Sequence, residues 1–368
     1  MSNPISRVDP VAPVSMVRPD LRQFTAYQAA SPARDAVRLH ANESAWRHDW
    51  DVSPSGLNRY PDPRPDAVLR RLAELYGVAV EELLLTRGSD DAIDVLLRAM
   101  CSAGQDRIVI CPPTFGMYAV AARLQCAAVD EVPLDASCDF ALDIDAVIQA
   151  GQRAKLVFLC SPNNPSGNLI PAAEVIAICR AMAGHGLVVV DEAYGEFAPQ
   201  QALTRLRREC PNLVLLRTLS KAYALAGARL GVLIADPDLV RVLRAVLPPY
   251  PVPSLCIEAA ERLLQPGPLA RAHEEARETV KRRERLRRDL AALPAVVRVW
   301  PSEGNFLLVQ CRDASSMVEA CADAGLLIRD FSRVAGLENC VRVTVGDVAQ
   351  NAGVLAAFRN TTAELAHG

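Results

Sequence analysis

The chain has 368 residues and a formal net charge of -3 at neutral pH. That length is enough for a large hydrophobic core and usually for two domains. The balanced charge gives no global basic field, so we expect neither nucleic acid nor an anionic membrane surface as the main partner. The 11 cysteines include no C-x-x-C pair and the five histidines are dispersed, so we expect no metal site.

The N-terminal segment is interrupted by prolines and has no continuous apolar core. We therefore expect a flexible arm over residues 1–20 rather than a signal peptide. No later run is long and apolar enough to cross a bilayer. The scattered cysteines lie mostly within apolar segments, which is typical of reduced thiols. These features predict a cytoplasmic protein.

Apolar runs alternate with helix-period segments through most of the chain. The expected strands cover residues 107–111, 154–160, 187–194, 213–218 and 229–236, and the expected helices cover 89–101, 172–184 and 236–247. Because these strands are continuously apolar and separated by helices, they indicate a largely parallel sheet that is covered on both faces.

The pattern changes near residue 268. Residues 268–294 are strongly charged and predict a long, solvated linker helix. Strand-like runs follow at 296–300, 305–310, 326–330 and 341–346, with helix-like segments at 314–324 and 348–358. We expect a smaller C-terminal α/β domain over 268–368, after a large domain over 56–267.

Polar residues follow three of the expected strands. Asn164 lies in the turn-forming stretch SPNNPSGN, and Asp191 follows the apolar run LVVV. Lys221 follows LVLLRT and stands among small residues. Alone, each has a simpler explanation: a tight turn, a helix N-cap, or a lysine that reaches solvent. Ligands of open α/β sheets bind at the carboxyl ends of strands, so we consider the three together.

Together these residues suit a pyridine aldehyde phosphate. Lys221 would form a Schiff base with the aldehyde and, once displaced by a substrate amine, would move the α-proton. Asp191 beside the ring nitrogen would keep that nitrogen protonated. Asn164 and Tyr194 would donate hydrogen bonds to the phenolate oxygen of the ring.

Other residues suit the phosphate and the face of the ring. Ser220 and Arg229 offer a hydroxyl and a guanidinium to the phosphate. Ser89 and Asp90 begin an expected helix, whose free N–H groups favour an anion, although an ordinary helix cap explains them equally well. Phe115 follows a strand and would lie on the ring, or would serve only as a core aromatic.

The ordered motifs resemble the fold-type I pyridoxal-phosphate aminotransferases, and within them the histidinol-phosphate aminotransferase family. The motifs are LHANES, LNRYPDP, TRGSDDAIDVLLRA, CPPTFGMY, CSPNNPSGN, VVVDEAYGEF, RTLSKAYALAGARLG, SEGNFLL, LLIRD and VRVTVG. The resemblance implies an α/β fold, with a mostly parallel seven-stranded sheet between helices in the large domain and a smaller α/β C-terminal domain. It also implies that residues 21–55 join the small domain and make dimer contacts.

The resemblance carries roles to individual residues. It implies pyridoxal 5'-phosphate as the cofactor and places Lys221, Asp191 and Tyr194 in catalysis. The implied cofactor-binding residues are Ser89, Asp90, Phe115, Asn164, Asp191, Tyr194, Ser220, Lys221, Arg229 and Tyr60. Phe115 stands where the family often has tyrosine, so a polar contact to the substrate at that position is in question.

The resemblance also implies a homodimer. Tyr60 matches a tyrosine that reaches the cofactor phosphate of the neighbouring subunit, and Tyr27 matches one that crosses to the substrate site of the partner. Asn42 lies in a motif associated with substrate binding. Arg342 matches the arginine that binds the substrate carboxylate, and Arg329 matches one at the phosphate end. Without the surrounding motifs, the simplest interpretation of both arginines is that they are solvated charges at the ends of strands.

The implied reaction transfers an amino group from histidinol phosphate to 2-oxoglutarate, reversibly, in histidine biosynthesis. Its small-molecule partners are two different anions, which guanidinium groups bind well. Alternatives are a decarboxylase of an O-phospho-amino acid and an aminotransferase for aromatic or branched-chain substrates. A transcription regulator with a cofactor-sensing domain would need a DNA-binding domain, for which residues 1–20 are too short.

Overall fold

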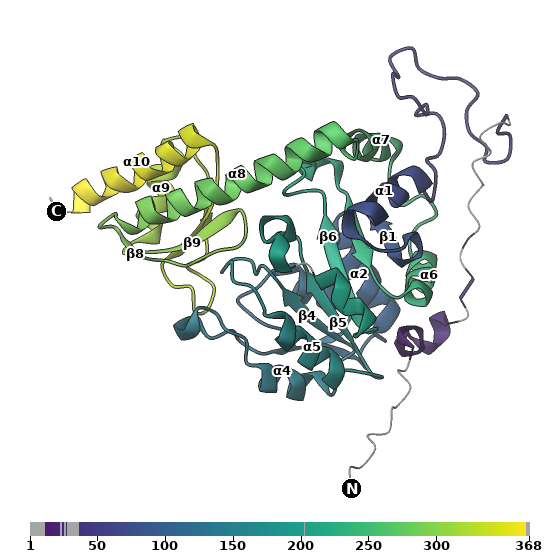
Figure 1. The fold of residues 1–368 in the computed structure, drawn as a ribbon, viewed down its shortest axis with the longest axis horizontal. Helices are drawn as coiled ribbons and strands as arrows, with labels where there is room; N and C mark the ends of the chain where they lie inside the picture. Colours follow the sequence, from purple (N-terminus) through teal and green to yellow (C-terminus); the bar gives the residue numbers. More distant parts are fainter. Residues whose placement is uncertain (1–11, 23, 26, 28–36, 202, 366–368) are drawn as a thin grey trace, which may run out of the picture.

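The computed structural model describes residues 12–22, 24–25, 27, 37–201 and 203–365. The chain forms two sheets, of seven and four strands, which the long helix α8 (Pro266–Ala291) connects (Figure 1). Most of the predicted flexible arm, residues 1–11, lies outside the described residues. The rest of the arm contains two short 3-10 turns, at Pro13–Met16 and Pro19–Leu21.

The large sheet is mostly parallel, as the sequence predicts. Its strands are β1 (Leu83–Thr86), β2 (Arg107–Ile110), β3 (Ala128–Glu131), β4 (Leu156–Cys160), β5 (Leu187–Asp191), β6 (Leu213–Thr218) and β7 (Gly231–Ile234). They lie in the order β1-β7-β6-β5-β4-β2-β3, and β7 is antiparallel to both of its neighbours. Every residue of β4, β5 and β6 is buried, because helices cover both faces.

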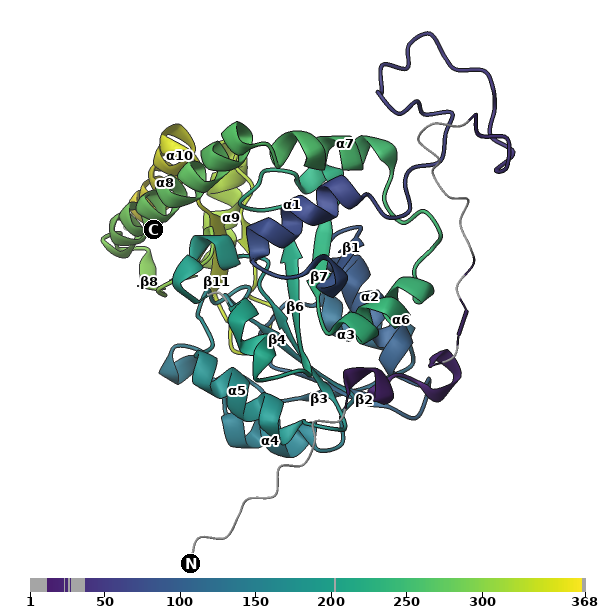
Figure 2. The ribbon, with the colours of Figure 1, turned by 45° about the vertical axis from the view of Figure 1, so that its right-hand side comes forward.

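Two layers of helices enclose this sheet (Figures 1 and 2). The helices α2 (Ser89–Met100), α3 (Met117–Leu124) and α6 (Pro237–Val246) pack in one hydrophobic cluster. The helices α1 (Asp66–Tyr76), α4 (Ile144–Gly151), α5 (Ala172–Ala181) and α7 (Ser254–Leu263) pack in another. Along β4, Phe158 faces the first cluster and Leu159 the second, as alternation along a strand requires.

The small sheet is antiparallel. Its strands are β8 (Val296–Val299), β9 (Phe306–Cys311), β10 (Arg329–Asp330) and β11 (Cys340–Thr344), in the order β10-β11-β9-β8. The helices α9 (Ala314–Asp323) and α10 (Val348–Leu365) complete this part of the chain. The predicted charged helix is α8; its residues Leu286 and Leu290 pack in the core of the small sheet.

The topology brings the polar loops together. Cys160, the last residue of β4, pairs with Asp191, the last of β5, and Asp191 pairs with Leu216 in β6. Because these strands are parallel, their following loops emerge at one edge of the sheet. Within the described residues, no helix has the length and apolarity to cross a membrane.

Candidate active site

A pocket lies at the carboxyl edge of the large sheet. Its lining residues are Ser89, Asp90, Phe115, Cys160, Asn164, Asp191, Ala193, Tyr194, Thr218, Ser220, Lys221 and Arg229. All the predicted cofactor-binding residues except Tyr60 are among them. Residues far apart in the sequence therefore share one pocket, because four strand ends and the start of α2 open into it.

Asp191 lies at the floor of this pocket and is almost completely buried. Its Oδ2 accepts a hydrogen bond of 2.8 Å from the hydroxyl of Tyr118, and its Oδ1 accepts one of 3.0 Å from the backbone N–H of Ala193. Burial raises the pKa of Asp191 to about 6, and the hydrogen bond from Tyr118 opposes that shift. The group is thus mostly a carboxylate at neutral pH, as a partner for a protonated ring nitrogen must be.

Lys221 stands at the mouth of the pocket with an exposed side chain. Its ammonium lies 5.7 Å from the centroid of the Tyr194 ring. Although solvent reaches the side chain, the surrounding protein desolvates the ammonium and lowers its pKa, and the positive charge of Arg342 adds to that effect. A lowered pKa favours the neutral amine, which is the form that acts as a nucleophile or base.

The turn before α2 and the guanidinium of Arg229 form an anion-binding corner. Gly88 has φ +87°, and a Cβ built there would lie 2.8 Å from Nη2 of Arg229. Nη2 donates to Oδ2 of Asp90 at 3.1 Å, and Nη1 donates to Oγ of Ser220 at 3.4 Å. With the free N–H groups at the start of the helix, these donors suit a phosphate.

The small sheet contributes a second guanidinium. Arg342, on β11, donates a hydrogen bond to Oδ1 of Asn164, so β11 reaches the pocket of the large sheet. Its Cζ lies 5.4 Å from the ring centroid of Phe306 and 5.5 Å from that of Phe331. Desolvation lowers its pKa, and the group remains charged. Arg329 pairs directly with Arg342 in the β10–β11 ladder.

Arg329 and Arg342 are not among the described residues that line this pocket, although Arg342 contacts Asn164, and three further predicted site residues lie away from it. Tyr60 stacks on Tyr250, with ring centroids 4.4 Å apart. Tyr27 is exposed and lines a different cavity, beside Leu84 of the edge strand β1. Asn42 is exposed, with φ +54°. None of the three is among the residues that line the pocket in the described part of the chain.

Sequence reasoning missed Cys160, Ala193 and Thr218, which line the pocket, and it also missed residues that contact the lining from behind. Tyr118, on α3, is the most important, since its hydroxyl contacts the carboxylate of Asp191. No helix was predicted over α3, so no local pattern indicated this residue. Arg217 is buried; its Nε lies 3.2 Å from Oε2 of Glu192, and its Nη1 lies 3.3 Å from Oε1 of Glu196. This ion cluster links the end of β6 to the loop after β5, and no local spacing indicates it.

The donor set fits pyridoxal phosphate. A buried carboxylate, an amine of lowered pKa and a helix N-terminus with an arginine stand around one pocket, as the pyridine nitrogen, aldehyde and phosphate of this cofactor require. Each cofactor group thus has a protein group of complementary charge or reactivity in the pocket.

Known proteins resemble this chain over nearly its whole length. Residues 32–358 match the family model for aminotransferase class I and II. The histidinol-phosphate aminotransferase of Stenotrophomonas maltophilia (strain R551-3) is 47% identical over 350 residues, which cover 94% of this chain and 96% of that protein. That of Xylella fastidiosa (strain 9a5c) is 46% identical over 355 residues, which cover 95% and 97%.

A solved structure shows the same fold. The histidinol-phosphate aminotransferase of Sinorhizobium meliloti, in complex with pyridoxal-5'-phosphate, superposes with a TM-score of 0.76 at 26% identity and covers 84% of each chain. The L-threonine-O-3-phosphate decarboxylase of Porphyromonas gingivalis, at 24% identity and a TM-score of 0.65, shares the fold alone. The chain belongs to the class I and II aminotransferases, and within them to the histidinol-phosphate aminotransferase family.

Proposed function

We propose that this protein is a pyridoxal-phosphate-dependent aminotransferase that converts histidinol phosphate and 2-oxoglutarate to imidazole-acetol phosphate and glutamate, reversibly, in histidine biosynthesis. One observation carries the proposal: Lys221 and Asp191 line a single pocket at the carboxyl edge of the sheet, and Arg342 contacts Asn164 of the same pocket. Identity of 47% to a histidinol-phosphate aminotransferase over 94% of the chain supports the choice of substrate.

The residues of the pocket would hold the cofactor as follows. Asp191 would bind the ring nitrogen, and Asn164 and Tyr194 would bind the phenolate oxygen. Ser220 and Arg229 would bind the phosphate, together with Ser89 and Asp90, and Phe115 would pack on the ring. Bound there, pyridoxal phosphate supplies an aldehyde that captures amines and a ring that withdraws electrons.

Lys221 would move the proton in the reaction. Its lowered pKa increases the fraction of neutral amine, which takes the proton from the α-carbon of the amino donor. Arg342 would bind the end of the substrate that carries the reacting carbon. The rings of Phe306 and Phe331 flank its guanidinium and so would keep the bound substrate in one position. A fixed substrate exposes the same C–H bond to Lys221 in every turnover.

We further propose a homodimer in which Tyr60 and Tyr27 complete the site of the partner. Both lie outside the pocket of their own chain, which supports a role elsewhere. The division into a large domain over 56–267 and a small domain over 268–368 belongs to the same proposal, as does a cytoplasmic location.

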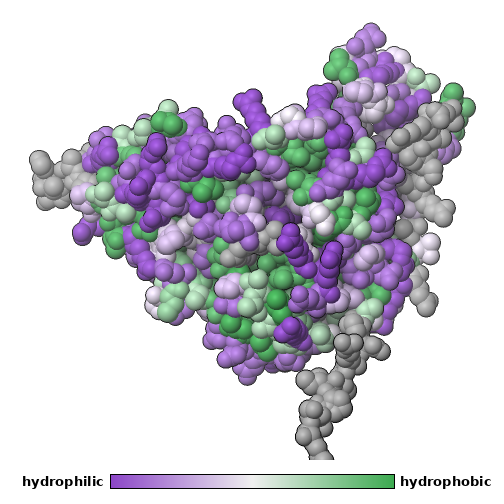
Figure 3. All heavy atoms as spheres, in the orientation of Figure 1, coloured by the Kyte–Doolittle hydropathy of each residue, from purple (hydrophilic) through white to green (hydrophobic). Residues whose placement is uncertain are grey.

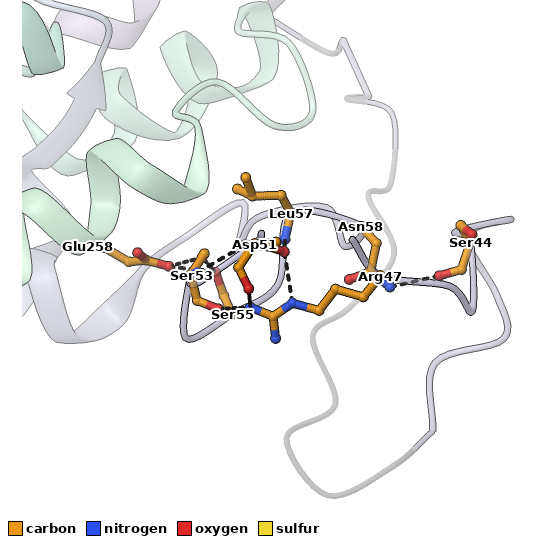
Figure 4. Close-up of polar contacts among 8 residues, drawn as sticks. All are labelled: Ser44, Arg47, Asp51, Ser53, Ser55, Leu57, Asn58 and Glu258. Carbon is orange, nitrogen blue, oxygen red and sulfur yellow. Dashed lines mark hydrogen bonds and ion pairs between the residues drawn. The ribbon is translucent and has the colours of Figure 1, made fainter. Parts of the chain in front are cut away.

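Hydrogen bonds hold the loop before Tyr60, residues 47–58, in one conformation, as a contact with a second subunit would require. The buried carboxylate of Asp51 accepts hydrogen bonds from Nε of Arg47 at 2.8 Å and from the N–H groups of Ser53 at 2.9 Å and Leu57 at 2.6 Å (Figure 4). Glu258, on α7, accepts hydrogen bonds from the hydroxyls of Ser53 and Ser55. The loop is therefore tied to the body of the molecule and keeps its own shape.

This braced loop exposes apolar side chains. The side chains of Trp46, Trp50 and Val52 are 64%, 66% and 91% exposed. The ring of His48 lies between the two indoles, with its centroid 4.1 Å from that of Trp46 and 4.8 Å from that of Trp50. At the upper right of Figure 3, the protruding loop carries scattered hydrophobic residues among more numerous hydrophilic ones. Exposed apolar groups on an ordered loop support an interface with a second copy of the chain.

Assays of three amino donors test the proposed reaction. The purified protein, saturated with pyridoxal phosphate, is incubated with 2-oxoglutarate and either histidinol phosphate, phenylalanine or phosphothreonine, and both glutamate and carbon dioxide are measured. We expect glutamate from histidinol phosphate, with a kcat/KM at least tenfold above that for phenylalanine. Release of carbon dioxide from phosphothreonine, with no glutamate from histidinol phosphate, would instead establish the decarboxylase.

A further inference from the structure

We propose that Tyr118 is a positioning residue that fixes the carboxyl group of Asp191 in the orientation and charge state that receive the pyridine N–H of the cofactor. The inference rests on the function proposed above for Asp191. The inference assigns a role to Tyr118, a residue of α3 that contacts the carboxylate of Asp191.

Hydrogen bonds fix both oxygens of Asp191. The hydroxyl of Tyr118 donates to Oδ2 at 2.8 Å, and the N–H of Ala193 donates to Oδ1 at 3.0 Å. With one donor on each oxygen, rotation of the carboxyl group would break both bonds. Each oxygen keeps further acceptor capacity, and Asp191 also lines the pocket.

Tyr118 cannot move away from this position. It has no exposed surface, and its ring stacks on Phe158 at 4.9 Å with an interplanar angle of 13°. On another side, the ring of Phe115 meets it edge to face at 5.6 Å. The same short segment thus sets both the aromatic residue proposed to pack on the cofactor and the donor behind Asp191.

The environment makes this donor important. Asp191 is buried among apolar residues of β4 and β5, and desolvation disfavours its charged form. Of the interactions that favour the charged form, the hydrogen bond from Tyr118 is the largest. Without it, the carboxyl group would take up a proton more readily and would no longer accept the pyridine N–H as an anion.

Binding of two cofactors to the apo form of the full chain tests the proposal. One ligand is pyridoxal phosphate and the other is its 1-deaza analogue, in which carbon replaces the ring nitrogen. We expect Tyr118→Phe to weaken binding of pyridoxal phosphate about tenfold or more and to change binding of the analogue less than threefold. The ratio of the two dissociation constants, measured on one preparation, does not depend on the fraction of folded protein.

Tyr76→Phe is the matched control. Tyr76 is also a buried tyrosine, and within the described residues its hydroxyl has no hydrogen-bond partner. We expect this variant to bind both ligands like the parent protein. An unchanged ratio in Tyr118→Phe would overturn the inference about Tyr118, and the parent protein would still bind pyridoxal phosphate. Failure of the parent protein to prefer pyridoxal phosphate over the analogue would instead count against the role of Asp191.

Discussion

Arg329 and Arg342 lie directly opposite each other on the antiparallel strands β10 and β11. Opposite residues of an antiparallel pair leave the same face of the sheet with their Cβ atoms about 5 Å apart. Arg342 is partly buried and contacts Asn164, whereas Arg329 is exposed. Desolvation and the like charge of Arg329 both lower the pKa of Arg342, so an anion between the two side chains is favoured. The pair suits substrates that carry a carboxylate or a phosphate.

The two arginines should affect the substrates differently. We expect Arg342→Gln to lower kcat/KM for both glutamate and histidinol phosphate, because in our proposal Arg342 holds the reacting end of either substrate. Arg329→Gln should lower kcat/KM about tenfold or more for histidinol phosphate and less for an amino donor that lacks a distal anion. Steady-state kinetics with Arg333→Gln, an exposed arginine nearby, as the control would test this. Equal losses for all donors in Arg329→Gln would contradict a role at the distal anion.

Mixing two inactive variants tests whether Tyr60 serves the neighbouring subunit. In the proposed homodimer, Tyr60→Ala and Lys221→Ala would each be defective at both sites, but a mixed dimer would have one site with both residues intact. With random exchange we expect about a quarter of the parent activity, measured at limiting pyridoxal phosphate. If Tyr60 acts within its own subunit, the mixture will show no more activity than the sum of the separate variants.

The buried carboxyl group of Asp191 should make the stability of the apo-protein depend on pH. Its pKa in the folded state is about 6, whereas its ordinary value is 3.8, so between these values the folded state binds more protons than the unfolded state. Stability from this group is therefore present at low pH and lost as pH rises to about 6. Relative to Asp191→Asn, the parent apo-protein should lose about 1 kcal/mol of unfolding free energy between pH 5 and 7.

Urea unfolding of both apo-proteins across that range, at one protein concentration, measures the difference. A constant difference between parent and variant would show that Asp191 titrates as it does in the unfolded chain. If the stability of the parent protein instead rose relative to the variant as pH rises, the pKa of Asp191 would be lowered in the folded state, and the protein would stabilise its carboxylate form.

Gly88 should matter for the phosphate and not only for the fold. Alanine at φ +87° is strained, and its Cβ would displace the guanidinium of Arg229. We expect Gly88→Ala to weaken binding of pyridoxal phosphate about tenfold while changing binding of pyridoxal, which lacks the phosphate, about twofold or less. Gly104→Ala is the control, because Gly104 has φ +71° and no atom within 4 Å of the added Cβ. Equal weakening for both ligands would exclude a specific effect on the phosphate.

Much of the fold could be predicted from the sequence, because β4, β5 and β6 are uniformly apolar and the segments between them have helical periodicity. The predicted ranges lie within a few residues of these elements. The strands β1 and β3 were missed. β3 is an edge strand whose residues Asp130 and Glu131 remove the apolar signal.

The site was predictable where each residue follows a strand end or begins a helix. The contacts of Tyr118 with Asp191 and of Arg217 with two glutamates join residues on separate elements, so they depend on packing that local patterns do not specify. The positions of Tyr27 and Tyr60 relative to a second subunit stay predictions for the same reason, as does the role of Asn42 in substrate binding.

In our proposal, Lys221 carries the cofactor and moves the proton. The chain has only three lysines, Lys155, Lys221 and Lys281, so covalent labelling can distinguish them. The protein is saturated with pyridoxal phosphate, reduced with borohydride, digested and examined by mass spectrometry. We expect a pyridoxyl group on Lys221 alone and no label there after incubation with excess histidinol phosphate. Stoichiometric label on Lys155 or Lys281, with Lys221 unmodified, would contradict it.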